Sequence, residues 1–212
     1  MTEKKEYQLP QQTNYETSFA MAREKLATMD FSRQCSLSGA GEVAGGAEID
    51  FIDRKFFIDG KTFEVSAADD GEGPELWAKI ITLHYFIAAD GTPPSGELIT
   101  YKQVPDGAPY YDIFNKRTGG ILLSVFGDKM DALVETAKGI GAGPVEGHGD
   151  KAFKVRALPM VEYIFVLYEA DEEFPPDIKV VFDSSIQSYL PAEDITVLCQ
   201  MICIGLVKRF YS

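Results

Sequence analysis

The sequence predicts an α+β fold in which a largely antiparallel sheet packs against helices, with helices flanking it at the N- and C-terminal ends. Helical and strand-like periodicities occupy partly separate stretches of the chain, which is typical of α+β proteins. An Asp-Gly pair at 59–60 stands between two β-rich runs and indicates a tight hairpin, which joins antiparallel strands. We expect a flexible tail over residues 1–12 and a single domain over residues 13–212.

The first and last helices follow from apolar spacing and from the charges at their ends. Thr13 and Glu16 have the spacing of a capping box, and apolar residues then recur at steps of three and four. These apolar residues are Tyr15, Phe19, Ala22, Leu26 and Met29. The last helix is expected from about Pro191, because acidic residues at 193–194 suit a helix N-terminus and basic residues at 208–209 suit a C-terminus.

Between these two helices the pattern alternates between strands and further helices. The expected strands are residues 48–58, 61–65, 98–104, 153–158, 161–168 and 178–182. The expected helices are residues 74–89, 109–117 and 128–138, with Gly119-Gly120 as a break between the last two. The run 161–168 is almost continuously apolar, which predicts a central strand.

The charge balance argues against two classes of partner. The 212 residues carry 33 acidic and 20 basic side chains, a formal net charge of −13. Binding to nucleic acid or to an anionic membrane rests on Lys and Arg, so neither partner is expected. The longest apolar stretch, 195–207, is shorter than the roughly 20 residues that a bilayer requires. An N-terminus without an apolar segment and an odd number of cysteines predict a cytoplasmic protein with reduced thiols.

An acidic cluster supplies the candidate metal ligands. Asp171, Glu172 and Glu173 follow the most apolar predicted strand, and Asp183 follows the next strand. Crowded carboxylates repel one another, and this repulsion is reduced by exposure to water, by a shared proton or by a bound cation. These four residues are therefore candidate ligands of a divalent metal such as Mg²⁺, Ca²⁺ or Mn²⁺. The alternative is a solvated turn, since the spacing matches no specific metal motif.

The two histidines, His84 and His148, are the candidate catalytic residues. Imidazole is the side chain that most easily acts as a general base near neutral pH. His84 lies seven residues after Trp77 and four after Ile80, on an apolar helix face, where a histidine is either a ligand or a core residue with one hydrogen bond. His148 stands in a glycine-flanked loop, which either meets a ligand or merely turns the chain.

Gly141, Gly143 and Gly149 are the candidate cofactor-binding residues, because a glycine-rich loop can present backbone N–H groups to an anion. The loop is not a nucleotide motif. A dinucleotide fingerprint follows a strand and opens a helix, whereas here a helix precedes the glycines and a strand follows them. The identity of any cofactor stays open.

Several short segments carry a resemblance to a known family. They are Leu83-His84-Tyr85-Phe86 with Ala89, Gly91 and Gly96; Gly149-Asp150; Tyr168 to Pro175; Phe182-Asp183; and Tyr189 to Asp194. With these segments the chain resembles DUF3786, an uncharacterised family of anaerobic bacteria and archaea, from roughly Tyr15 to Gln200. Family members often have Trp-Glu-Gly where this chain has Tyr168-Glu169-Ala170. Some also carry a cysteine-rich segment that this chain lacks, so no iron–sulfur cluster is implied.

The resemblance implies an anaerobic setting and a link to one-carbon, corrinoid or redox-cofactor metabolism, and it implies no catalytic residues. Two functional hypotheses follow. The first is a soluble binding or accessory protein, whose acidic edge docks a basic protein partner or which holds a small-molecule cofactor. The alternative is a metal-dependent enzyme of hydrolase or lyase type with a carboxylate/His site. The oligomeric state is not predicted.

Overall fold

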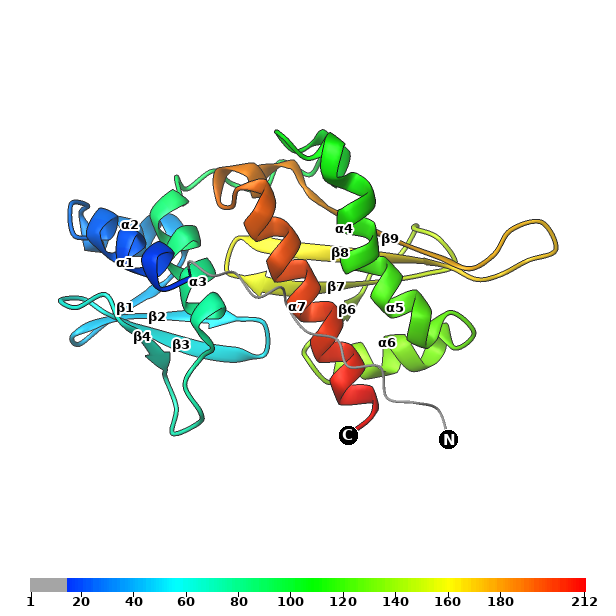
Figure 1. Cartoon of the computed structure of the whole chain (residues 1–212), viewed down its shortest axis with the longest axis horizontal. Helices are drawn as coiled ribbons and strands as arrows, with labels where there is room; N and C mark the ends of the chain where they lie inside the picture. The colour runs from blue at the N-terminus through cyan, green and yellow to red at the C-terminus, as the bar shows by residue number, and fades with distance from the viewer. Residues whose placement is uncertain (1–14) are drawn as a thin grey trace.

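Two antiparallel sheets, each packed against helices, form the structure (Figure 1). The computed structural model describes residues 15–212, so the expected tail 1–12 and the capping residue Thr13 lie outside the described residues. Helices and strands are both abundant and both sheets are antiparallel, which confirms the predicted α+β class.

The first sheet, made of β1 to β4, has its strands in chain order. Its strands are β1 (Gly41–Val43), β2 (Gly46–Phe51), β3 (Arg54–Asp59) and β4 (Val65–Ala67). Three helices lie beside it: α1 (Tyr15–Leu26), α2 (Phe31–Ser38) and α3 (Leu76–Ala88). The helix α1 buries Phe19, Ala22 and Leu26, the apolar face that its sequence predicts, and packs along α3.

The second sheet has the strand order β5-β9-β8-β7-β6. Its strands are β5 (Leu98–Thr100), β6 (Gly143–Pro144), β7 (Lys151–Leu158), β8 (Val161–Tyr168) and β9 (Asp177–Asp183). The associated helices are α4 (Tyr111–Arg117), α5 (Gly119–Phe126), α6 (Met130–Lys138) and α7 (Ala192–Phe210), with 3₁₀ turns at Tyr101–Gln103, Ala108–Tyr110 and Ser184–Ser188. The apolar strand β8 occupies the centre of this sheet, as predicted.

The helix α7 crosses one face of the second sheet next to α4 and α5 (Figure 1). Its first turn is tied to the sheet by Tyr163, whose hydroxyl donates to the carbonyl of Ile195 at 2.8 Å. The acidic and basic ends that predicted this helix are both present, with Glu193 and Asp194 in its first turn and Lys208 and Arg209 in its last. None of the described helices combines the length and apolarity that a membrane span requires.

The hairpin around 48–65 differs from the prediction. The strand expected over 48–58 is two strands, and the chain turns at Ile52-Asp53 instead of first turning at Asp59-Gly60. Ile52 takes a positive φ of 57°, a conformation that β-branched residues rarely adopt and that the sequence therefore does not indicate. Its N–H donates to the carbonyl of Ala157 in β7 at 2.8 Å, so this turn also joins the two sheets.

The helix α4 ends at Arg117 as predicted and a break follows at Thr118, but Gly119-Gly120 is not itself the break, because Gly119 begins α5, a helix that the sequence does not predict. The reason is a close approach of two backbones. A Cβ atom on Gly119 would lie 2.4 Å from the carbonyl oxygen of Ile178 in β9. The glycine is therefore required by packing against the sheet and does not mark a loop.

Candidate functional site

The candidate site is built around a contact between His84 of α3 and Asp194 of α7. Nδ1 of His84 lies 2.7 Å from Oδ2 of Asp194. Because a carboxylate only accepts hydrogen bonds, Nδ1–H is the donor, and Nε2 is the ring nitrogen left for a ligand. The Asp194 side chain is 11% exposed and that of His84 is 35% exposed, so the pair stands at the boundary between core and solvent.

Local sequence explains why both side chains meet there. The helix α3 buries most of its apolar residues, and His84 lies on the side that faces α1 and the start of α7. Asp194 is the third residue of α7, where an acidic side chain also complements the positive helix N-terminus. The pair therefore links the helices beside the first sheet to a helix that packs on the second.

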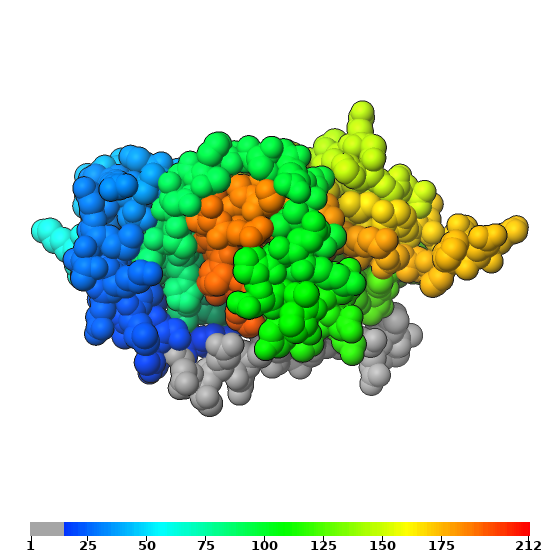
Figure 2. Space-filling model, turned by 90° about the horizontal axis from the view of Figure 1, so that it is seen from above, coloured from blue at the N-terminus to red at the C-terminus, as the bar shows by residue number. Residues whose placement is uncertain are grey.

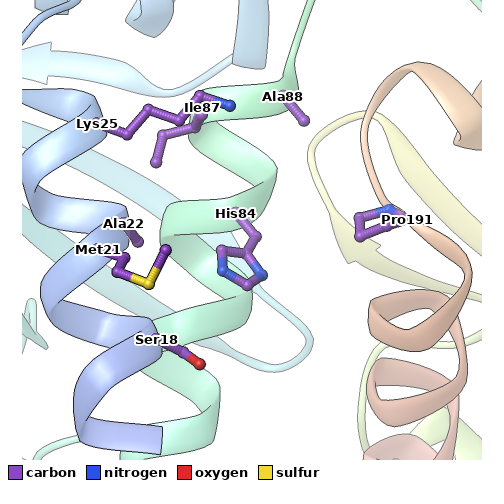
Figure 3. Close-up of a pocket in the computed structure, with 8 residues that line it drawn as sticks. All are labelled: Ser18, Met21, Ala22, Lys25, His84, Ile87, Ala88 and Pro191. Atoms are coloured by element: carbon purple, nitrogen blue, oxygen red, sulfur yellow. The ribbon is translucent and has the colours of Figure 1, made fainter.

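Two adjoining cavities flank His84. The larger has a volume of about 450 Å³ and lies between α1, α3 and the turn before α7 (Figure 3). Its lining residues are Ser18, Met21, Ala22, Lys25, His84, Ile87, Ala88 and Pro191. In the close-up, Met21 and Ala22 of α1 lie beside His84 of α3, with Pro191 on the opposite side. The walls are mostly apolar, as is usual for sites that bind small organic molecules.

The smaller cavity, of about 240 Å³, shares Ser18, His84 and Pro191 with the larger one. Its other lining residues are Tyr15, Trp77, Ile80, Ile81, Glu193, Asp194 and Val197. Trp77 is the single tryptophan of the chain. We refer to the two cavities together as the His84 cleft.

A second charged contact lies beside the smaller cavity and involves Glu193, one of its lining residues. Nη1 of Arg117, from α4, lies 3.6 Å from Oε1 of Glu193, and Nε donates to Oε1 of Gln200 at 2.8 Å. Nη2 of Arg117 is buried and has no hydrogen-bond acceptor among the described residues. Both carboxylates that line the cleft, Glu193 and Asp194, are thus already paired with side chains of the protein.

The family model of DUF3786, a domain of unknown function, matches residues 28–204, which is most of the chain. This protein belongs to the DUF3786 family. The resemblance seen in the sequence is thereby confirmed. Neither the curated proteins nor the solved structures gave a match.

In this DUF3786 protein, His148 lies away from the His84 cleft. It stands in the exposed bend between β6 and β7 and lines neither of the two cavities. The structure thus places the two candidate catalytic histidines in different surroundings. His84 has a carboxylate partner and a cleft, whereas His148 is surrounded by solvent.

The three candidate glycines do not converge on one point. Gly141, with φ +78°, closes the turn after α6, and its N–H donates to the carbonyl of Lys138. Gly143 pairs with Lys154 in the sheet. Gly149, with φ +54°, packs so closely that a Cβ atom would lie 2.6 Å from the carbonyl oxygen of Leu167. Turn geometry accounts for Gly141 and close packing for Gly149, whereas a Cβ atom at Gly143 would meet nothing within 4 Å.

The four candidate metal ligands are also separated. Asp171 lies in the loop before β9, where its Oδ1 accepts from the N–H groups of Glu173 and Phe174 at 2.8 and 2.7 Å. Asp183 lies at the opposite end of β9, a seven-residue strand that spans about 20 Å. No group of three or more His, Cys, Asp or Glu side chains within residues 15–212 is placed to hold a metal ion.

Asp183 instead organises the loop before β5. Its carboxylate accepts hydrogen bonds from the backbone N–H groups of Ser95, Gly96 and Ser185 at 2.7–2.9 Å. Partial burial raises the pKa of Asp183, but these hydrogen bonds outweigh that effect and lower it well below its usual range. These hydrogen bonds account for the position and the lowered pKa of the Asp183 carboxylate without a bound cation.

The acidic loop projects from the body of the protein. Residues 169–176 connect β8 to β9 and extend beyond the second sheet (Figure 2). Their carboxylates face solvent, and Phe174 is 66% exposed. We call residues 169–176 the acidic arm. Its position agrees with a solvated turn and is also accessible to a partner.

Sequence reasoning missed Asp194 as a partner of His84, because its place in the first turn of α7 already accounts for an acidic residue there. The residues are 110 positions apart in the chain, so no local pattern joins them. The sequence likewise does not mark Lys25 and Pro191 as cleft residues. The apolar face that carries Trp77, Ile80 and His84 was the available signal, and it does line the cleft.

Proposed function

We propose that this DUF3786 protein is a binding protein that holds a small organic molecule in the His84 cleft. The observation that carries the proposal is the His84–Asp194 contact at 2.7 Å, at the junction of two mostly apolar cavities. Small-molecule sites typically combine apolar walls with a few polar groups that orient the ligand. Asp194 orients the imidazole in advance, so Nε2 can bind a ligand with little loss of side-chain freedom.

The proposed setting is cytoplasmic and linked to anaerobic one-carbon, corrinoid or redox-cofactor metabolism. Two features of the cleft support a cofactor as the ligand. Its volume, about 450 Å³ in the larger cavity, suits a small molecule or one part of a larger cofactor. Metal-ligating histidines commonly donate a hydrogen bond from their other ring nitrogen to a carboxylate, as His84 does to Asp194.

The test uses the fluorescence of Trp77, which lines the cleft. The full chain is titrated with FMN and with aquocobinamide, a corrinoid whose cobalt has an exchangeable axial ligand. We expect at least one of them to quench Trp77 with a micromolar Kd, and Ala88→Phe, which places a larger side chain in the wall of the larger cavity, to abolish the effect. If neither cofactor binds, or if Ala88→Phe binds as the wild type does, the proposal is wrong.

Histidine substitutions separate the role of the imidazole from that of the walls. His84→Gln should weaken binding of the same cofactor about ten-fold or more, because the polar anchor is lost. His148→Gln is the matched control, since His148 lies outside the cleft, and should bind as the wild type does.

The second candidate function is a metal-dependent enzyme of hydrolase or lyase type, although no group of three or more metal-ligating side chains within residues 15–212 surrounds His84. In that case His84 would act as a ligand or as a general base, with Asp194 holding the imidazole. Elemental analysis of protein purified without oxygen tests this candidate. About one metal per chain, lost in His84→Gln and retained in His148→Gln, would support it, and the same metal content in both variants would exclude His84 as a ligand.

We also include in the proposal a basic protein partner for the acidic arm. The arm is exposed, carries several carboxylates and includes the exposed ring of Phe174. Exposed charges at the edge of a protein–protein interface increase the rate of association and make that rate sensitive to salt. Binding to such a partner should weaken steeply with ionic strength, and a complex that is insensitive to salt would contradict docking through the arm.

A further inference from the structure

The charges around the His84 cleft are unevenly distributed. Two of the eight residues that line the larger cavity are ionisable, Lys25 and His84, and neither carries negative charge. The carboxylates belong to the smaller cavity, where Glu193 is paired with Arg117 and Asp194 with His84. Within residues 15–212 no carboxylate forms an ion pair with Lys25. The cleft therefore has an unmatched positive charge although the protein carries a net charge of −13.

The position of Lys25 adds a geometric argument. Lys25 lies one turn beyond Met21 and Ala22 on α1, and its side chain extends toward Ile87 and the end of α3 (Figure 3). His84 lies about one turn before Ile87 on α3. Lys25 and His84 therefore border the same cavity from two neighbouring helices, with apolar side chains between and below them.

We infer that the ligand of the cleft is an amphiphilic organic anion, an inference that rests on the proposed function. Its apolar ring or chain packs between α1 and α3, against Met21, Ile87 and Pro191. Its anionic group, such as a carboxylate, sulfonate or phosphate, contacts the ammonium of Lys25 on the side of the cleft that has no carboxylate. A neutral molecule of the same shape lacks this contact and binds more weakly.

The test compares two probes that share one ring system and differ in charge. They are 8-anilinonaphthalene-1-sulfonate, which is an anion, and N-phenyl-1-naphthylamine, which lacks the sulfonate. Energy transfer from Trp77, which lines the smaller cavity, reports binding at the cleft. We expect the anion to bind about five-fold tighter or more, with an advantage that falls as salt is added.

The Lys25→Met variant tests whether Lys25 is the residue that causes the preference for the anionic probe. This exposed position tolerates the change, so the variant should fold normally. We expect it to weaken binding of the anion about five-fold and to leave binding of the neutral probe unchanged. Lys61→Met is the matched control, because it removes an exposed lysine in the turn between β3 and β4 and should leave the binding of both probes unchanged.

Each outcome separates the two proposals. If both probes bind, both are displaced by Ala88→Phe and the anion is preferred only when Lys25 is present, the inference is supported. If the neutral probe binds as tightly as the anion, or Lys25→Met leaves the preference intact, the inference is wrong and the proposed function still holds. If neither probe binds, or Ala88→Phe does not affect them, the inference is overturned, and the titrations with FMN and aquocobinamide decide the proposed function separately.

Discussion

Nδ1 of His84 and Oδ2 of Asp194 lie 2.7 Å apart and join α3 to the first turn of α7 across 110 residues of chain. The contact holds the imidazole at the junction of two apolar cavities and gives it a fixed orientation. It also connects helices that pack on different sheets. A contribution to folding stability is therefore expected in addition to any role in binding.

Removing the carboxylate should reveal that contribution. We expect Asp194→Ala to lower the free energy of unfolding by about 1–3 kcal/mol, because a nearly buried hydrogen bond between polar groups is lost. Urea denaturation of Asp194→Ala, His84→Gln and the double variant gives the coupling between the two side chains, expected at about 1 kcal/mol. A coupling near zero would show that the contact does not stabilise the fold.

The hydrogen bonds to Asp183 predict a specific dependence of stability on pH. A carboxyl group whose pKa is lowered by folding stabilises the protein above its unfolded pKa, and the stabilisation is lost as the pH falls through the folded pKa. The ordinary value for Asp is 3.8, and folding lowers it. Asp183→Asn should therefore be less stable than wild type near neutral pH, by about 1–2 kcal/mol, and the difference should shrink below about pH 4.

Urea unfolding midpoints measured at several pH values check this prediction. Glu172→Gln is a suitable control, because Glu172 is an exposed acidic residue in the acidic arm and should not change the pH profile. A stability difference between wild type and Asp183→Asn that stays constant down to about pH 3 would contradict the proposed linkage.

The sequence predicts most elements of this fold because their signals are local. Apolar spacing indicates α1 and α3, terminal charges indicate α7, and an apolar run indicates β8. The errors occur where a distant contact decides the local conformation. Ile52 turns the chain although it is β-branched, and its N–H donates to a carbonyl of β7. Residue 119 is a glycine because the start of α5 packs closely on β9, and not because the chain forms a loop there.

The candidate site follows the same division. His84 could be identified from its apolar helix face, but its partner could not, because the approach of α7 to α3 depends on how the two sheets and their helices pack. The acidic arm shows the converse case. Its carboxylates are adjacent in sequence, yet the structure directs them to solvent and places Asp183 at the far end of β9.

The three cysteines should be unreactive in the folded protein. Cys35, Cys199 and Cys203 are all buried and form no disulfide. Burial raises the pKa of the Cys35 thiol to about 11 and that of Cys199 well above its usual range, so little thiolate exists at neutral pH. We expect Ellman's reagent to modify all three thiols in denaturant and none on the same timescale in buffer. Rapid reaction of one thiol in buffer would reveal an opening of the core around it.

Two glycine-to-alanine substitutions should change stability in opposite directions. At Gly119 a methyl group would lie 2.4 Å from the carbonyl oxygen of Ile178, so α5 or β9 must shift. We expect Gly119→Ala to lower the free energy of unfolding by about 1–3 kcal/mol. Gly205 lies inside α7 on its exposed side, where a methyl group would meet no atom within 4 Å outside its own turns of the helix.

Gly205→Ala should therefore raise the free energy of unfolding by about 0.5–1 kcal/mol, because alanine loses less backbone entropy than glycine when a helix forms. Urea denaturation of both variants under one set of conditions measures the contrast. Gly119→Ala changes the packing of α5 on β9, whereas Gly205→Ala changes only helix propensity. A stable Gly119→Ala would therefore show that α5 can move away from the sheet, whereas a destabilised Gly205→Ala would show that the exposed side of α7 is covered by another part of the molecule or by a second copy.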